Sequence, residues 1–246
     1  MDGGDDTRGA TIQESQEMMQ KSEIKELLSS YNLQPVIEAA QKDRSIIRML
    51  ISLVYDKEDV QSWRAIEAIG LVSGEIAKTN ADLVRNLSQR FLWMLREESG
   101  NGPGSAPEML GEIVRNSPDV FADIGQVLTS FHDEKMLRRG VMRAIWRICE
   151  KRPELLCMTC ELMDEKLYLN DEDAVVRAYA LMAAGAMGMK DLLPVMEGLR
   201  DDQSPVRFYH DGDFLQTTVG EIANNVCAGI AGRGTVQLHN TSGRTR

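Results

Sequence analysis

One apolar pattern recurs about every 40 residues along most of this chain, and this repetition limits the folds that the chain can adopt. Five segments that begin near residues 63, 106, 138, 176 and 214 can be aligned. One column of the alignment then holds the small or apolar residues Ala68, Met109, Ala144, Ala184 and Thr218. A second apolar column follows four residues later. Because positions four residues apart lie on the same side of a helix, the two columns predict one buried helical face in each repeat.

A second apolar segment follows each of these helices. In residues 82–95, for example, Leu83, Leu87, Phe91 and Leu95 recur at four-residue steps. Short acidic turns, such as NDED at 170–173, separate most of the resulting helix pairs. The composition also favours helices over strands, since aromatic residues make up only 5% of the chain and there are 14 methionines. We therefore expect an all-α fold, an α-α superhelix or solenoid of about five helical hairpins.

Composition and charge limit the domain organisation and the partners. The polar residues 1–20 and the Gly/Thr/Arg-rich residues 229–246 are expected to form disordered tails on a single domain over 21–228. A net charge of -10 argues against binding to nucleic acid or to an anionic membrane. No apolar run is long enough to span a membrane, and no secretory signal is evident, so a cytoplasmic protein is expected.

The repeat resembles a known one. The stretch NDEDAVVRAYALMAAGAMG resembles the HEAT-like repeat of phycobilisome lyases, with its acidic turn, Val-Arg pair, alanines one turn apart and terminal glycine. The resemblance covers roughly residues 34–228. The ESG, APE and GEI segments near residue 105, with the later DGDF and TVGEIA, resemble a family of small HEAT-repeat proteins of bacteria and archaea. These resemblances imply a fold and no particular reaction.

A glycine-rich segment interrupts the third repeat. In REESGNGPGSAPEMLGEIV, residues 99–104 cannot continue a helix, and Ser105 and Glu108 are spaced as a capping box that restarts it. Because the helix of this repeat begins only at Ser105, we expect a notch in the solenoid. Its backbone N–H groups would face outward and could bind a phosphate or carboxylate. The segment could instead only accommodate an irregular stacking angle. The candidate residues of this notch are Glu97, Ser99, Gly100, Gly102, Gly104 and Ser105.

Two further features are candidates for partner binding. Arg139, Arg143 and Arg147 follow one another at four-residue steps and predict a basic ridge for an acidic partner segment, unless nearby carboxylates such as Glu150 neutralise them. Trp93 is in line with Arg90 on the polar side of its helix, which predicts an exposed anchor on the concave surface. A small error in phase would bury Trp93 instead.

The remaining aromatic, cysteine and histidine residues suggest structural roles. Trp63 and Trp146 lie near the buried columns and are expected in the core. The cysteines at 149, 157 and 160 have a metal-like spacing, but they lie in amphipathic helices without a nearby histidine, so small buried thiols are the simpler interpretation. His210 could take part in acid-base chemistry or bind a cation, whereas a turn built on Asp211-Gly212 is the simpler reading of its surroundings.

The sequence favours a non-catalytic interaction scaffold or an assembly or maturation factor. Its partner would bind the concave face near repeats 3 and 4, and no metal or cofactor is expected. The alternative is a lyase or chaperone-like protein that acts on a small anionic ligand or cofactor at the glycine-rich notch. A DNA-binding solenoid is a third hypothesis, and the negative charge argues against it.

Overall fold

The structure is a computed structural model that describes residues 19–96, 104–156 and 168–232. Its described elements, in chain order, are α1 (Lys21–Ser29), α2 (Gln34–Lys42), α3 (Ser45–Ile51), α4 (Val60–Arg96), α5 (Ala106–Asn116), α6 (Pro118–Thr129), α7 (Arg138–Cys149), α8 (Ala174–Met187), the 3-10 helix η3 (Lys190–Leu192), α9 (Leu193–Gly198), β1 (Pro205–His210), β2 (Asp213–Thr218) and α10 (Val219–Ile230). None of the described helices is long and apolar enough to cross a membrane.

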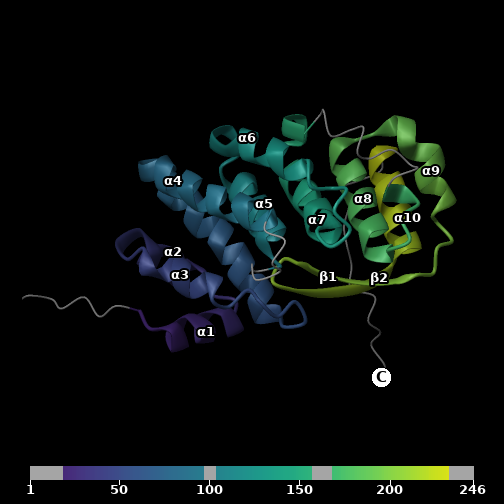
Figure 1. The fold of residues 1–246 in the computed structure, drawn as a ribbon. Coiled ribbons are helices and arrows are strands. Elements are labelled where there is room, and N and C mark those ends of the chain that lie inside the picture. Colours follow the sequence, from purple (N-terminus) through teal and green to yellow (C-terminus); the bar gives the residue numbers. More distant parts are fainter. Residues whose placement is uncertain (1–18, 97–103, 157–167, 233–246) are drawn as a thin grey trace, which may run out of the picture.

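The first helices of the repeats stack in chain order. The first half of α4 packs on α5, α5 on α7, α7 on α8, and α8 on α10 (Figure 1). We call the surface of this row the first-helix face. A second set of helices, comprising α3, the second half of α4, and α6, packs against the row. The all-α superhelix predicted from the repeat pattern is confirmed.

Helix α4 is itself a helical hairpin. The backbone leaves the helical region at Asn80, with φ -150° and ψ 74°, and divides α4 into two halves. The side chain of Asn80 then accepts a hydrogen bond from the N–H of Leu83 at 3.1 Å, which caps the second half. One continuous stretch thus supplies both helices of the second repeat.

The predicted buried column is correct in four of its five positions. Ala68, Met109, Ala144 and Ala184 are fully buried. Thr218 was assigned wrongly to this column, because it is the N-cap of α10 and forms a capping box with Glu221. The longer connection before α10 displaces the last repeat from the register of the others.

A β-hairpin is the main departure from the predicted fold. The turn expected at Asp211-Gly212 is present, and both residues have positive φ, 44° and 91°. It joins two antiparallel strands, with Tyr209 opposite Phe214, that the sequence analysis did not predict. The hairpin extends from the α9–α10 end of the molecule to α4 and α1, and it lies across the row of first helices (Figure 1).

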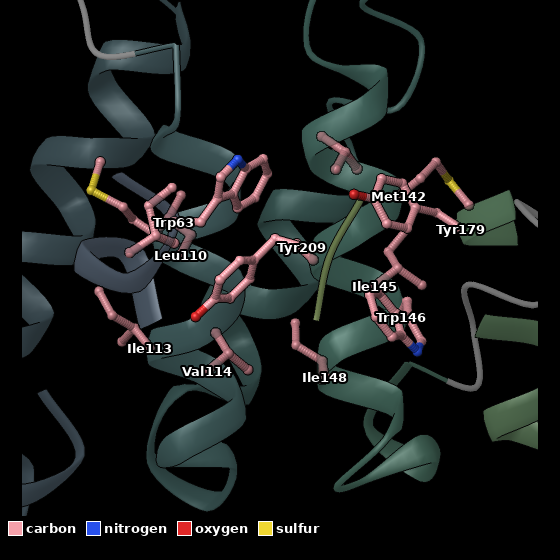
Figure 2. Close-up of a cluster of buried hydrophobic side chains, with 14 of the residues drawn as sticks. Trp63, Leu110, Ile113, Val114, Met142, Ile145, Trp146, Ile148, Tyr179 and Tyr209 are labelled. Carbon is pink, nitrogen blue, oxygen red and sulfur yellow. The ribbon is translucent and has the colours of Figure 1, made fainter. Parts of the chain in front are cut away.

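Aromatic side chains attach the hairpin to the helices. Trp63 stacks on Tyr209, with ring centroids 5.8 Å apart, and Trp146 lies edge-on to Phe208 at 5.9 Å. Figure 2 shows Tyr209 pointing into the apolar cluster formed by α4, α5 and α7. Trp63 and Trp146 are buried, so their predicted place in the core is confirmed.

Close helix packing at Gly111 generates a first prediction. A Cβ atom at this position would lie 2.6 Å from the Cβ and 2.7 Å from the Cα of Ala144. Alanine would add about 1 kcal/mol of helix propensity, but overpacking costs about 1–3 kcal/mol. Since part of the clash is with backbone, we expect Gly111→Ala to lower the free energy of unfolding, as measured by urea denaturation.

Gly198→Ala is the matched control, because an added Cβ there meets nothing within 4 Å. It should leave the free energy of unfolding unchanged or slightly raised. Equal stability of the two variants would show that α5 and α7 are not packed at this distance.

Candidate functional site

The predicted basic ridge is largely internal. Arg143 and Arg147 are only 1% and 2% exposed, so the expectation that they form an accessible row with Arg139 is wrong for both. They bind the carboxylate of Glu112, which is fully buried on α5. Arg143 Nη2 donates to Glu112 Oε1 at 3.1 Å, and Arg147 Nε donates to the same oxygen at 2.9 Å. Arg147 also binds Glu150, one of the carboxylates suggested by the sequence.

The buried pair of arginines keeps Glu112 ionised. Burial alone would raise the pKa of this carboxyl, but the positive charges of Arg147 and Arg143 outweigh burial and lower the pKa to about 2. In return, Glu112 and Glu150 raise the pKa of Arg147 against the effect of its own burial. The three side chains therefore form a charged cluster that holds α5 and α7 together.

The β-hairpin closes over this cluster. The guanidinium of Arg143 lies over the Trp63 ring, 4.8 Å from its centroid, and Trp63 stacks on Tyr209 of β1. The hydroxyl of Tyr209 donates to Glu67, whose other oxygen accepts from the hydroxyl of Tyr31 at 2.9 Å. Burial and the charge of Glu67 raise the pKa of Tyr209 well above its ordinary value, so the phenol stays protonated.

The turn end of the hairpin is also held, through Gly212 and His210. Arg64 of α4 donates from Nε to the carbonyl of Gly212 at 2.7 Å. The ring of His210 stacks on Trp146, with centroids 5.4 Å apart, and its Nε2 lies 3.7 Å from Glu150. Within the described residues, His210 thus has structural partners on α7, and the hairpin occupies the first-helix face from α8 to α4.

The glycine-rich notch differs from the prediction where the structure describes it. Ser105 is the N-cap of α5, as expected, but its hydroxyl donates to the carbonyl of Val54 at 2.8 Å. Glu108 accepts from Lys57 at 2.6 Å, so no capping box forms. Residues 105–108 are buried, and the expectation that this helix start faces outward is wrong. Gly104 is exposed, while Glu97, Ser99, Gly100 and Gly102 lie outside the described residues.

Trp93 and Arg90 are exposed on the second half of α4. The side chain of Trp93 is 61% exposed, so the alternative in which a phase error buries it is wrong. Arg139 is exposed too, but it pairs with Asp173 at the start of α8. Of the predicted binding residues that the structure describes, Trp93 and Arg90 therefore lie together on an open surface, apart from the buried Arg143 and Arg147.

A groove that the sequence analysis did not predict lies beside Arg90. It is formed between α3 and the second half of α4 and has a volume of about 340 Å³. Its lining residues are Arg44, Ile47, Arg48, Ile51, Leu83, Asn86, Leu87 and Arg90. We call it the α3–α4 groove. Its signal in the sequence is the four-residue spacing of Arg44 with Arg48 and of Leu83 with Leu87 on neighbouring helices.

Two of the four cysteines lie in the described helices α7 and α10. Cys149 and Cys227 are buried, at 1% exposure each. Cys157 and Cys160 lie outside the described residues. Across the three described ranges, no cluster of three or more histidine, cysteine, aspartate or glutamate residues is arranged to hold a metal ion.

Comparison with known proteins agrees with the observed architecture. No family model matches the chain. A designed armadillo repeat protein, YIII(Dq)4CqI, superposes with a TM-score of 0.50 at 16% identity, over 85% of this chain and 92% of its own. The chain has an armadillo- and HEAT-like solenoid fold. A second designed armadillo repeat protein, solved in complex with the peptide (KR)4, gives a TM-score of 0.51 at 16% identity, over 85% and 91% of the two chains.

One relative resembles this solenoid in sequence. An uncharacterised protein of Archaeoglobus fulgidus is 27% identical to it over 174 residues, which cover 70% of this chain and 91% of that protein. The narrower likeness to phycobilisome-lyase repeats stays an expectation from the sequence.

Removal of the central carboxylate tests the charged cluster. Glu112→Gln would leave Arg143 and Arg147 buried without their shared counter-charge. Breaking a buried ion pair in this way costs about 3–5 kcal/mol, so we expect a loss of this order in the free energy of unfolding, measured by chemical denaturation.

Asp123→Asn is the control, because Asp123 pairs with Arg85 at 2.6 Å on the surface. Exposed pairs contribute about 0–1 kcal/mol. A Glu112→Gln variant as stable as Asp123→Asn would mean that the cluster does not hold the helices together.

Proposed function

We propose that this protein is a non-catalytic interaction scaffold or assembly factor, and that its partner binds the face formed by α3, the second half of α4, and α6. The observation that carries the proposal is the closure of the first-helix face by the chain's own hairpin. Solenoids bind partners along extended helical surfaces. Because the β-hairpin covers the first-helix face, the surface that stays open is the one formed by the second helices.

Exposed apolar side chains support this placement. Trp93 on α4 is 61% exposed, and Val120 and Val127 on α6 are 39% and 36% exposed. The two helices are neighbours, because Arg85 of α4 binds both Asp123 and the carbonyl of Val120. An exposed tryptophan is a common interface anchor, and α6 adds exposed apolar residues on a neighbouring helix. We therefore propose a surface nearer repeats 2 and 3, whereas the sequence analysis expected repeats 3 and 4.

The solenoid fold favours a protein or peptide partner in general. One of the similar designed proteins was solved in complex with a peptide, (KR)4. The alternative of a lyase or chaperone-like protein depended on an open helix start at the notch, and the described residues there, Ser105 and Glu108, are buried and engaged. The interaction scaffold is the function that we carry forward.

Replacement of Trp93 tests the proposed surface. Wild type and Trp93→Ala should be used as bait in cells that naturally produce the protein, with captured proteins quantified by mass spectrometry. Loss of an interface tryptophan weakens binding by about tenfold or more, so the recovery of specific partners should fall accordingly.

Tyr55→Ala is the matched control. Tyr55 is an aromatic residue with a similar exposure, 64%, but it lies beside Ser29 of α1. It should recover the same partners as wild type. Undiminished capture by Trp93→Ala, or no specific partner on wild type, would contradict the proposal.

A further inference from the structure

The α3–α4 groove combines an apolar floor with a basic rim. Ile47 and Leu87 are buried at its base, and Ile51 and Leu83 are partly buried beside them. Arg44, the N-cap residue of α3, and Arg48 of α3 stand on one wall, and Arg90 of α4 stands on the other. The groove can therefore accept an apolar side chain at its centre and negative charge on both sides.

Within the described parts of the chain, the three rim arginines form no direct ion pair. All three are exposed, and none forms an ion pair or a hydrogen bond with a described residue. Asp43, the adjacent acidic residue in sequence, is already engaged as an acceptor by the backbone N–H of Ser45 at 2.8 Å and by its hydroxyl at 2.6 Å. Arg48 acts on Asp43 as a nearby charge only.

Several other surface arginines are paired with carboxylates. Arg152 binds Asp119 and Glu154, Arg139 binds Asp173, and Arg200 binds Glu197. The chain has ten more acidic than basic residues, which is its net charge of -10. In so acidic a protein, three unpaired arginines around one apolar groove form a local positive field that attracts carboxylates.

We propose that the α3–α4 groove binds an acidic segment of a partner protein that carries a large apolar side chain between its carboxylates. The apolar side chain contacts Ile47 and Leu87, and the flanking carboxylates receive the guanidinium groups of Arg44, Arg48 and Arg90. Guanidinium groups bind carboxylates through paired N–H donors, which adds direction to the charge attraction. This inference rests on the proposed function and specifies where and what the scaffold binds.

Trp93 extends the same surface. It lies three residues after Arg90, almost one helical turn along α4, and its side chain is open to solvent. A segment seated in the groove can continue along α4 and cover this ring. Trp93 fluorescence therefore offers a second report of binding close to the groove.

A selection of peptides tests the inference without knowledge of the partner. A library of short random peptides is selected on the full-length wild-type protein, and the enriched peptides are measured by fluorescence anisotropy. We expect acidic sequences with at least one large apolar residue. Their binding should weaken about tenfold or more in the triple variant Arg44→Glu/Arg48→Glu/Arg90→Glu, and also with rising salt.

The control variant is Arg139→Glu/Arg152→Glu/Arg200→Glu. It makes the same change in net charge at exposed arginines that are paired elsewhere, and it should bind the peptides within about twofold of wild type. Thermal unfolding of both triple variants establishes that they remain folded. A milder variant, Arg44→Ala/Arg90→Ala, replaces the first one if it does not fold.

The outcomes separate the two proposals. Enriched peptides that are basic or uncharged, or that bind both triple variants equally, overturn the groove while the scaffold function stands. Failure to enrich any peptide on the wild-type protein counts against both. Enrichment of acidic-apolar peptides that depend on the rim arginines supports both.

Discussion

The carboxylate of Glu112 is the charge around which the described helices are organised. Burying this negative charge without a counter-charge would cost free energy. Arg143 and Arg147 of the next repeat supply the positive charges that offset this cost. The same arginines connect the cluster to the hairpin, since Arg143 lies over Trp63 and Trp63 stacks on Tyr209. One buried carboxylate thus links two repeats to a strand more than ninety residues away in sequence.

This arrangement explains why the two faces of the solenoid differ. A repeat normally contacts only its neighbours, so a long solenoid can bend. Here the hairpin contacts α8 and α7 through Phe208 and its neighbours and reaches α4 through the carbonyl of Gly212. It restrains the stack along its length and uses the first-helix face in doing so. The second helices keep an open surface, on which Trp93 and the α3–α4 groove are exposed.

The sequence predicted the helical repeats well because their information is local. Apolar spacing recurs along the chain and acidic turns separate most of the repeats. Trp63, Trp146 and the Asp211-Gly212 turn were placed correctly from their surroundings. The strands flanking that turn were missed because a single short aromatic segment was interpreted as a connection. With alternating Val206 and Phe208 before an Asp-Gly pair, the hairpin signal was present.

The errors at the site have a different cause, since they depend on contacts between distant residues. The four-residue spacing of Arg143 and Arg147 shows that they share a side of α7, but not that this side meets Glu112 of another repeat. Ser105 and Glu108 match a capping box, yet in space their side chains bind Val54 and Lys57 instead. The exposure of Trp93 was predicted correctly from its position on the polar side of its helix. This prediction needed only the residue spacing within α4 and no contact with a distant residue.

The most direct test of this account is the pKa of Glu112 in the folded protein, measured by NMR titration of its side-chain carboxyl carbon. The charges of Arg147 and Arg143 outweigh the effect of burial and predict a pKa of about 2 for Glu112, well below the ordinary 4.5. The folded state should therefore lose stability as the pH falls from about 4.5 toward 2, because the unfolded chain binds the proton more tightly. A pKa at or above the ordinary value would contradict the account, since Glu112 could not then be the ionised link between α5, α7 and the hairpin.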